Sequence, residues 1–218
     1  MEVFTMTTEN IPSGGETEDG QLFKMVGHSY DKMGERYHRF RNNEKFIGEL
    51  EQFVGLLPPS GDVLDAGCGV GKPTSEYLAK QGFKVTGVDI SGRMIELAKQ
   101  NVPDVKFHQK NILELDFPNN AFDGIICVYT LWHIPREHHA NIIENFHRML
   151  KDDGILVLNT GVYESDGMSR FFGEPMLWST NDPKKTLGVV KSLGFEILQE
   201  GILNLGGERQ YWIFAKKK

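Results

Sequence analysis

The sequence predicts an α/β fold: a doubly wound, mostly parallel seven-stranded sheet with helices on both faces and an antiparallel final strand. From residue 61 onward, short apolar runs alternate with segments of helical apolar spacing, which is typical of βαβ units. The last two apolar runs, 195–200 and 211–216, are joined by a link too short for a helical crossover. A glycine-rich stretch, VLDAGCGVGKPT (63–74), follows the first strand, at the edge where such sheets bind ligands.

An arm and two helices are expected before the sheet. Residues 1–21 contain no Lys or Arg and are rich in small polar residues, which predicts a flexible arm, with a substrate lid as the alternative. Helical spacing indicates one helix over 28–40 and another that starts near 46 and stops at Pro58. We expect residues 22–60 to form helices that close over the site and residues 61–218 to form the core.

The core elements follow in alternation, and each is bounded by a recognisable signal. Ser91 is a candidate N-cap, and Asp182 followed by Pro183 opens the last helix. Residues 161–182 read as a long irregular segment. Strands are expected at 62–67, 83–89, 104–109, 122–129, 155–161, 195–200 and 211–216, and helices at 72–81, from 91 to before 103, from about 135 to 150, and from 182 to 194.

Composition narrows the class of protein. The formal net charge is −6, from 24 basic and 30 acidic side chains among 218 residues, and this argues against broad binding of a nucleic-acid backbone. Cys68 and Cys127 are the two cysteines and lack metal-ligand spacing, so a reducing cytoplasm is expected. The longest apolar stretch is too short to span a membrane. We therefore expect a cytoplasmic protein without a membrane partner.

The glycine loop fails the rules for two well-known phosphate loops. A P-loop needs Ser or Thr directly after its lysine, whereas Pro73 follows Lys72. A dinucleotide loop needs G-x-G-x-x-G, whereas Gly67, Gly69 and Gly71 are spaced G-x-G-x-G. The context of strand, glycine loop and helix start still predicts a site for a nucleoside-containing ligand.

A second acidic residue completes the pattern. Asp65 begins D-x-G-x-G-x-G, and Asp89 ends the next strand 20 residues after Gly69, where a carboxylate can accept hydrogen bonds from ribose hydroxyls. The ordered set resembles the class I S-adenosylmethionine-dependent methyltransferases from about residue 28 to the C-terminus. The resemblance implies a Rossmann-like fold, S-adenosylmethionine as cofactor and S-adenosylhomocysteine as product.

The resemblance also implies roles for single residues. Asp65 would fix the loop and reach the amino group of the cofactor, and Asp89 would take the ribose hydroxyls. Met94 would lie against the adenine ring. In KNILEL, the Asn111 carbonyl and the Ile112 N–H would hold the adenine edge; many family members carry Asp in place of this Asn.

The remaining implied contacts come from the loop, the fourth strand and the first helix. Glycines 67, 69 and 71 would let the backbone approach the cofactor, and the Cys127 carbonyl would face its ammonium group. Tyr30 and Tyr37 resemble an aromatic pair that closes over the cofactor. For Met94 and the two tyrosines, simple packing in the core is the alternative.

His133, in YTLWHIP after the fourth strand, is the candidate general base, because its ordinary pKa of ~6.5 suits proton transfer. The alternative is a structural loop histidine, and Trp132 either lines the pocket or packs. The segment 161–182 supplies Arg170, Phe171 and Trp178 as a candidate wall over the acceptor; a surface flap with its own small core is the alternative.

The acceptor is expected to be a small molecule. The [NDS]-P-P-[FYW] motif of nucleic-acid amino-methyltransferases is missing after the fourth strand, and no metal-ligand cluster appears in the sequence. A nicotinamide-dependent oxidoreductase and a nonenzymatic S-adenosylmethionine-binding regulator remain as alternatives. The atom that is methylated and the choice between monomer and homodimer stay open.

Overall fold

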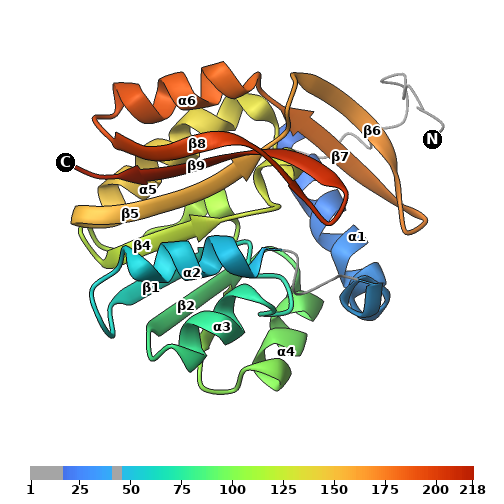
Figure 1. Cartoon of the computed structure of the whole chain (residues 1–218). Coiled ribbons are helices and arrows are strands. Elements are labelled where there is room, and N and C mark those ends of the chain that lie inside the picture. Colours follow the sequence, from blue (N-terminus) through green and yellow to red (C-terminus); the bar gives the residue numbers. More distant parts are fainter. Residues whose placement is uncertain (1–16, 41–45) are drawn as a thin grey trace.

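The computed structural model describes residues 17–40 and 46–218. Its main sheet has seven strands in the order β3-β2-β1-β4-β5-β9-β8, and β9 runs antiparallel to both of its neighbours (Figure 1). The predicted fold class, including the antiparallel strand at the end of the chain, is confirmed. The strands of this sheet are β1 (Asp62–Ala66), β2 (Lys84–Asp89), β3 (Lys106–Gln109), β4 (Phe122–Cys127), β5 (Leu150–Thr160), β8 (Glu196–Leu205) and β9 (Glu208–Lys216).

The order of the strands places the ligand-binding edge. β1 pairs in parallel with β2 on one side and with β4 on the other, so the chain changes direction across the sheet between these strands. The loops that follow β1 and β4 therefore meet at the carboxyl edge. In open α/β sheets this switch point forms a crevice in which ligands bind.

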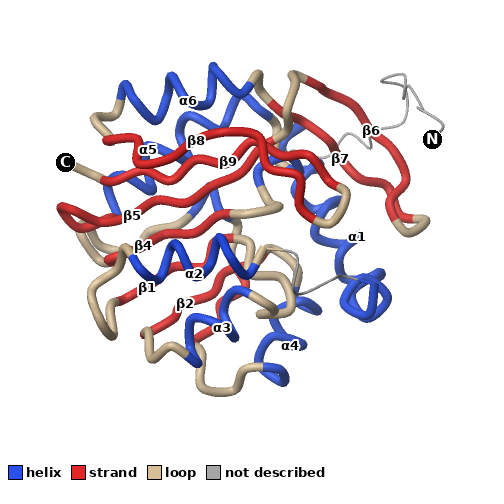
Figure 2. Tube along the Cα trace, viewed as in Figure 1, coloured by secondary structure: helices blue, strands red, loops and turns tan. Residues whose placement is uncertain are grey.

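Helices cover both faces of the sheet (Figures 1 and 2). One core cluster joins α2, α3 and α4 to the sheet, and the other joins α5 and α6 to the opposite face, so apolar strand residues are buried from both sides. The helices are α1 (Glu18–Phe40), α2 (Ile47–Gly55), α3 (Thr74–Lys80), α4 (Gly92–Asn101), α5 (His139–Met149) and α6 (Pro183–Ser192). In the described residues, none of these helices has both the length and the apolar character needed to cross a membrane.

Two helix starts follow directly from the local sequence. The Ser91 hydroxyl accepts a hydrogen bond from the Met94 N–H at 3.1 Å, and Asp182 accepts one from the Lys184 N–H at 2.8 Å. Side-chain oxygens at these positions satisfy N–H groups that have no partner within the helix. Both predicted N-caps are confirmed.

The segment 161–182 differs from its prediction. In place of an irregular segment, it forms a two-stranded hairpin of β6 (Ser165–Phe171) and β7 (Glu174–Thr180). Phe172 and Gly173 turn between the strands with φ of 51° and 86°, the positive values that a tight hairpin turn requires. The strand SDGMSRF lacks regular apolar alternation, so its sequence gives no strand signal.

The hairpin packs on α1, and both lie at the carboxyl edge of the main sheet (Figure 1). Val26 and Met33 of α1 share a small core with Met176 and Leu177 of β7. The helix starts at Glu18, so residues 18–21 are helical although the sequence predicts a flexible arm there; residues 1–16 of that arm lie outside the described residues.

Candidate functional site

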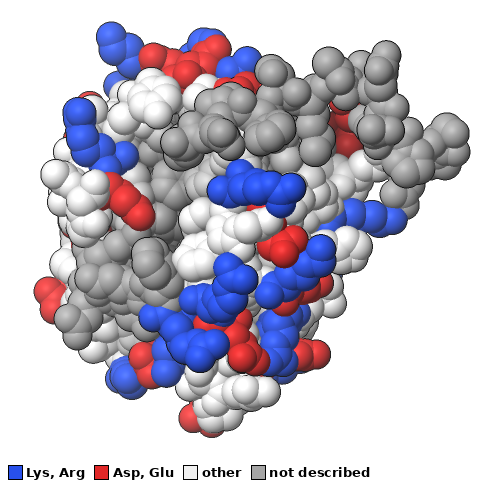
Figure 3. Space-filling model, turned by 90° about the vertical axis from the view of Figure 1, so that its right-hand side faces the viewer, with Lys and Arg blue, Asp and Glu red and all other residues white. Residues whose placement is uncertain are grey.

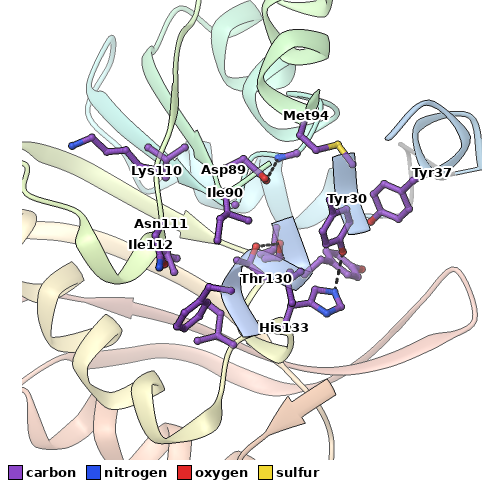
Figure 4. A pocket seen from close by; sticks show the side chains of 18 residues that line it. Tyr30, Tyr37, Asp89, Ile90, Met94, Lys110, Asn111, Ile112, Thr130 and His133 are labelled. Atoms are coloured by element: carbon purple, nitrogen blue, oxygen red, sulfur yellow. Dashed lines mark hydrogen bonds between the residues drawn. The ribbon is translucent and has the colours of Figure 1, made fainter. Parts of the chain in front are cut away.

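A cavity that is partly open to solvent lies at the carboxyl edge beneath α1 (Figure 4). Its walls come from the loops after β1, β2, β3 and β4 and from one face of α1. Its lining residues are Phe23, Val26, Tyr30, Tyr37, Gly67, Gly69, Val88, Asp89, Ile90, Met94, Lys110, Asn111, Ile112, Val128, Tyr129, Thr130, His133 and Ile134. We call the part formed by 67–69, 88–94 and 110–112 the glycine-loop end, and the part formed by Tyr30, Tyr37, Tyr129, Thr130 and His133 the histidine end.

The glycine loop is held against β2 by backbone hydrogen bonds. The N–H groups of Gly67 and Cys68 donate to the Val88 carbonyl at 2.8 and 2.9 Å. Gly67 has a φ of 83°, and a Cβ placed on it would lie 2.0 Å from Oγ1 of Thr130. Only glycine combines this backbone angle with this close approach, so the loop and the segment after β4 form one tight unit.

Asp89 is the carboxyl group of the glycine-loop end and is half-buried. It accepts hydrogen bonds from the Gly69 and Ser91 N–H groups, both at 2.9 Å. Burial raises its pKa to about 6, against the lowering effect of these backbone donors. A carboxylate offers about four lone-pair sites, so two backbone donors leave capacity for hydroxyl groups of a ligand.

Hydrogen bonds also connect α1 to the turn that follows Asp89. Oδ1 of Asp31 accepts hydrogen bonds from the Ser91 hydroxyl at 2.6 Å and from the Arg93 N–H at 3.0 Å. Ser91 therefore connects Asp31 on the helix to Asp89 on the strand. This connection fixes where α1 crosses the carboxyl edge.

Met94, Asn111 and Ile112 form the rest of the glycine-loop end. Met94 is almost fully buried and lines the cavity with Asn111 and Ile112. The Asn111 carbonyl accepts a hydrogen bond from the Leu113 N–H at 3.1 Å, which orients its side chain at the start of a short 3₁₀ turn. An amide oxygen has a second lone pair with which to meet a ligand donor.

His133 is the centre of the histidine end. Its Nδ1 lies 2.9 Å from the Leu177 carbonyl and its Nε2 lies 2.9 Å from the Tyr30 hydroxyl. A carbonyl can only accept, so we assign the ring hydrogen to Nδ1, and Nε2 then accepts from the Tyr30 O–H. Burial lowers the pKa of His133 to about 4, against the raising effect of the Leu177 carbonyl. The imidazole is therefore neutral at neutral pH and is a weaker base than its sequence context indicates.

A second buried histidine supports the loop that carries His133. Nε2 of His139 lies 2.8 Å from the Leu131 carbonyl and 3.0 Å from the Ile134 carbonyl, so it donates to the loop. Its contacts show a structural role in holding the turn from Leu131 to His133.

Aromatic side chains surround His133 behind the cavity wall. The Trp178 ring centre is 4.8 Å from that of His133, and the Trp132 ring centre is 6.3 Å from it. Phe171 packs edge-on against Trp178. Trp132, Phe171 and Trp178 thus support the histidine end but are not among the residues that line the cavity.

Nine of the residues predicted for the site line one cavity, and seven do not. Those that line it are Tyr30, Tyr37, Gly67, Gly69, Asp89, Met94, Asn111, Ile112 and His133. Those outside its lining are Asp65, Gly71, Cys127, Trp132, Arg170, Phe171 and Trp178.

The seven residues outside the lining have other surroundings. Asp65 accepts a hydrogen bond from the Ser75 hydroxyl at 2.6 Å, and Gly71 faces Phe107 beneath the loop. Cys127 is fully buried, and burial raises the pKa of its thiol far above the ordinary range. Arg170 is exposed and donates to the Gly173 carbonyl at 2.7 Å in the hairpin turn.

Sequence reasoning missed several lining residues. Phe23 and Val26 extend the Tyr30 and Tyr37 stripe of α1 by i, i+3 and i+4 steps, a signal lost because the helix starts earlier than predicted. Tyr129 lines the cavity with a φ of 60°, which is uncommon for a residue with a side chain. Nothing in its sequence context indicates this conformation.

Charge is unevenly distributed over the cavity and the outer face. Of the lining residues, only Asp89 and Lys110 carry charge at neutral pH, and both lie at the glycine-loop end (Figure 4). On the face seen in Figure 3, basic and acidic side chains are interleaved. Ion pairs of the described residues include Arg93 of α4 with Glu35 of α1 and with Glu96, and Lys32 of α1 with Glu174 of β7. Among the described residues, no three His, Cys, Asp or Glu side chains gather as a metal site.

Comparison with known proteins finds sequence similarity to methyltransferases. Residues 63–154, from β1 into β5, match a family model described as a methyltransferase domain. A 2-methyl-6-phytyl-1,4-hydroquinone methyltransferase from Synechocystis is 39% identical over 119 residues, which cover 52% of this chain and 36% of that protein. The chain spans less than half the length of this curated relative and of several others that it matches.

Solved structures show the same fold. A 1,6-didemethyltoxoflavin-N1-methyltransferase from Burkholderia thailandensis superposes with a TM-score of 0.71 at 19% identity and covers 100% of both chains. A magnesium protoporphyrin IX methyltransferase from Synechocystis superposes with a TM-score of 0.72 at 20% identity and covers 94% of this chain and 100% of that one. Residues 63–154 are thus similar in sequence to a methyltransferase domain, and the chain shares the fold of solved methyltransferases.

Proposed function

We propose that this protein is an S-adenosylmethionine-dependent methyltransferase that acts on a small-molecule acceptor. The observation that carries the proposal is that Asp89, Gly67 and Gly69 line the same cavity as Met94 and Asn111. A carboxyl group, glycine backbone at the cavity wall and apolar side chains together match the ribose, amino-acid and adenine parts of this cofactor.

The chemistry of the cavity lining fits the cofactor. In this proposal, the Asp89 carboxyl group accepts hydrogen bonds from ribose hydroxyls, and the Asn111 side-chain carbonyl accepts one from the adenine amine. Met94 and Ile112 supply apolar surface for the adenine ring.

The chain's own part in the reaction is to position the reactants and to exclude water. Bound S-adenosylmethionine supplies an activated methyl group on a sulfonium, and no covalent protein intermediate is needed. α1 crosses the open edge of the cavity and is fixed on one side by Asp31 and on the other by Ser29, whose hydroxyl donates to the Pro175 carbonyl at 2.7 Å. Holding nucleophile and methyl group aligned in a dry site lowers the entropic part of the barrier.

A small acceptor is favoured over a macromolecule. The cavity lies under α1, and the face seen in Figure 3 carries interleaved charges in place of a basic stripe. The curated and structural relatives named above include enzymes described by a hydroquinone, a toxoflavin precursor and a porphyrin. The two free, buried cysteines are consistent with our further proposal of a cytoplasmic location.

Calorimetric titration tests the proposed function. Purified protein is titrated with S-adenosylmethionine, S-adenosylhomocysteine, NADH and ATP, and selective binding of the first two is expected. Asp104→Ala, at an exposed turn away from the cavity, is the control and should bind as the wild type does. Binding of NADH in preference to S-adenosylmethionine would assign the site to a nicotinamide enzyme. Cofactor binding without methyl transfer across an acceptor screen, together with a stable protein partner, would favour a regulator.

A further inference from the structure

The histidine end contains a continuous chain of hydrogen bonds that starts at the cavity surface. The Leu177 carbonyl accepts from Nδ1–H of His133, and Nε2 of His133 accepts from the Tyr30 hydroxyl. Tyr30 lines the cavity, and its contact with His133 joins residues 103 positions apart in the sequence (Figure 4). The only hydrogen of the Tyr30 hydroxyl is thus directed away from a ligand and toward the imidazole.

This direction determines what Tyr30 does toward a bound molecule. A hydroxyl whose hydrogen is given to another group offers its oxygen lone pairs as acceptors. Tyr30 therefore acts as an acceptor toward a hydroxyl hydrogen, and His133 lies directly behind it to receive the tyrosine's own hydrogen. Since Nδ1 is fixed on the Leu177 carbonyl, the imidazole cannot rotate to present a donor in place of Nε2.

The residues of the histidine end favour an acceptor that is uncharged and flat. Of the described residues at the histidine end, none is an Asp, Glu, Lys or Arg, so an acceptor that enters as an anion or leaves as a cation has no charged partner there. Tyr30, Tyr37 and Tyr129 line this end, and Tyr30 and Tyr37 pack edge to face with ring centres 5.7 Å apart. Such a wall suits a flat ring.

Because His133 is a weak base, the hydroxyl group of the acceptor must be comparatively acidic. Because burial lowers its pKa to about 4, His133 is a poor acceptor for the proton of an ordinary alcohol. A phenolic hydroxyl, with a pKa of ~10 as in tyrosine, gives up its proton far more readily. The proton becomes more acidic still as the oxygen forms its new bond to carbon.

We propose that Tyr30, held in place by His133, accepts the hydrogen bond and then the proton of the acceptor, and that the acceptor is an uncharged ring compound with a phenolic or enolic O–H. This inference rests on the proposed methyltransferase function. The acceptor oxygen forms its bond to the methyl carbon with a lone pair, and the electron pair of the broken carbon–sulfur bond stays on sulfur. The acceptor proton moves to Oη of Tyr30 as the Tyr30 proton moves to Nε2 of His133, and water then removes the proton from the imidazolium. Tyr30 is the group in contact with the acceptor, and His133 is a positioning residue that acts through it.

A matched pair of ligands tests the inference by binding alone. Phenol and anisole have similar shapes, but only phenol can donate to Tyr30. Ligand-detected NMR titrations are made with the protein saturated with S-adenosylhomocysteine. We expect phenol to bind about 3- to 10-fold more tightly than anisole, as one neutral hydrogen bond allows. We expect Tyr30→Phe to remove this preference and Tyr163→Phe, an exposed site far from the cavity lining, to keep it.

Two variants of His133 separate positioning from simple support of the fold. In His133→Leu, the Tyr30 hydrogen is released and can donate to the oxygen of either ligand, so the ratio should fall to about 1. His133→Gln restores an acceptor for Tyr30 and should recover part of the preference. Loss of packing alone would weaken both ligands equally and leave the ratio unchanged.

The outcomes distinguish failure of this inference from failure of the proposed function. If S-adenosylhomocysteine does not bind, the methyltransferase proposal fails, and this inference fails with it. If S-adenosylhomocysteine binds, the proposed function stands, and the ring compounds then test this inference. The inference is overturned if neither ring compound binds, if phenol is not preferred, or if the preference survives Tyr30→Phe. If Tyr30→Phe does not fold, the ratio in His133→Leu against His133→Gln decides.

Discussion

The two ends of the cavity are built in different ways. The glycine-loop end comes from short segments that directly follow β1, β2 and β3, and it is held by backbone hydrogen bonds such as those from Gly67 and Gly69. The histidine end is assembled from α1, the loop after β4 and the hairpin, and its contacts join residues 103 and 146 positions apart, as in Tyr30–His133 and Ser29–Pro175. The glycine-loop end is therefore fixed by the strands of the sheet, whereas the histidine end depends on how separate elements pack together.

Because of this difference, we expect the two ends of the cavity to have separate roles. A loop fixed to the core by its backbone gives a constant frame for a cofactor. An end made of docked side chains can change its acceptor without disturbing that frame, as expected when function lies in sites placed on a common fold. Substitutions at the glycine-loop end should therefore affect folding and cofactor binding, and those at the histidine end should affect closure and acceptor choice.

The largest effect is expected from Gly67→Ala. The new Cβ would lie 2.0 Å from Oγ1 of Thr130, on a backbone with a φ of 83°. The backbone strain and the overlap should together lower the free energy of unfolding by about 2–5 kcal/mol, as measured by chemical denaturation. The control Gly188→Ala, exposed in α6 with no atom within 4 Å of the new Cβ, should instead stabilise the protein by about 0.5–1 kcal/mol. Equal stability of the Gly67 variant and the wild type would contradict the tight packing of this loop.

Asp89→Asn should have the next largest effect and should act on the cofactor. Loss of a charged acceptor for ribose hydroxyls is expected to weaken S-adenosylmethionine binding by about 1–3 kcal/mol, as measured by calorimetry. Asp104→Ala is again the matched control. An unchanged dissociation constant for Asp89→Asn would mean that the ribose lies elsewhere in the cavity.

Because the pKa of Asp89 is raised, cofactor binding and the free energy of unfolding should change in opposite directions with pH. Cofactor binding should weaken as the pH falls through about 6, because the carboxyl group then takes up a proton. The free energy of unfolding should decrease by about 1–3 kcal/mol as the pH rises from about 4 to about 6, because the unfolded chain releases this proton at a lower pH than the folded protein. Titrations of binding and of stability on Asp89→Asn should lack both changes. A wild-type binding curve that is flat across this range would argue against the raised pKa.

A smaller effect is expected at the contact between α1 and the hairpin. Ser29→Ala removes the buried hydrogen bond to the Pro175 carbonyl and should weaken docking of α1 by about 1 kcal/mol. Hydrogen exchange in α1 should become faster, while exchange in β1 and β4 stays the same. Ser192→Ala, which removes a local contact at the exposed end of α6, should leave α1 unaffected. Unchanged exchange in α1 would show that the apolar contacts alone hold this helix.

The smallest effect is expected from Arg170→Ala. The sequence places Arg170 on the acceptor wall, but its guanidinium is exposed and bonds to the Gly173 carbonyl of its own turn. Its removal should change the free energy of unfolding by no more than about 0.5 kcal/mol and should leave the phenol-to-anisole preference intact. A clear loss of that preference would show that Arg170 contributes to the acceptor site, as the sequence predicts.

Much of the glycine-loop end follows from local sequence. The loop of Gly67, Gly69 and Gly71, the acid that ends β2 and the cap at Ser91 can all be recognised because each depends on neighbours in the chain. The mostly parallel sheet and the antiparallel final pair follow equally from the alternation of elements and the length of their links. These features need no knowledge of contacts between distant segments.

Only the tertiary structure decided the histidine end. The hairpin at 165–180 is hidden in a segment without alternation, and the early start of α1 hides the contribution of Phe23 and Val26. The sequence singles out His133 and Tyr30, but for separate roles and with an ordinary histidine pKa. Their hydrogen bond, the neutral imidazole and the exclusion of Arg170 from the cavity all arise from burial and from contacts between segments far apart in the chain, which no local pattern of residues encodes.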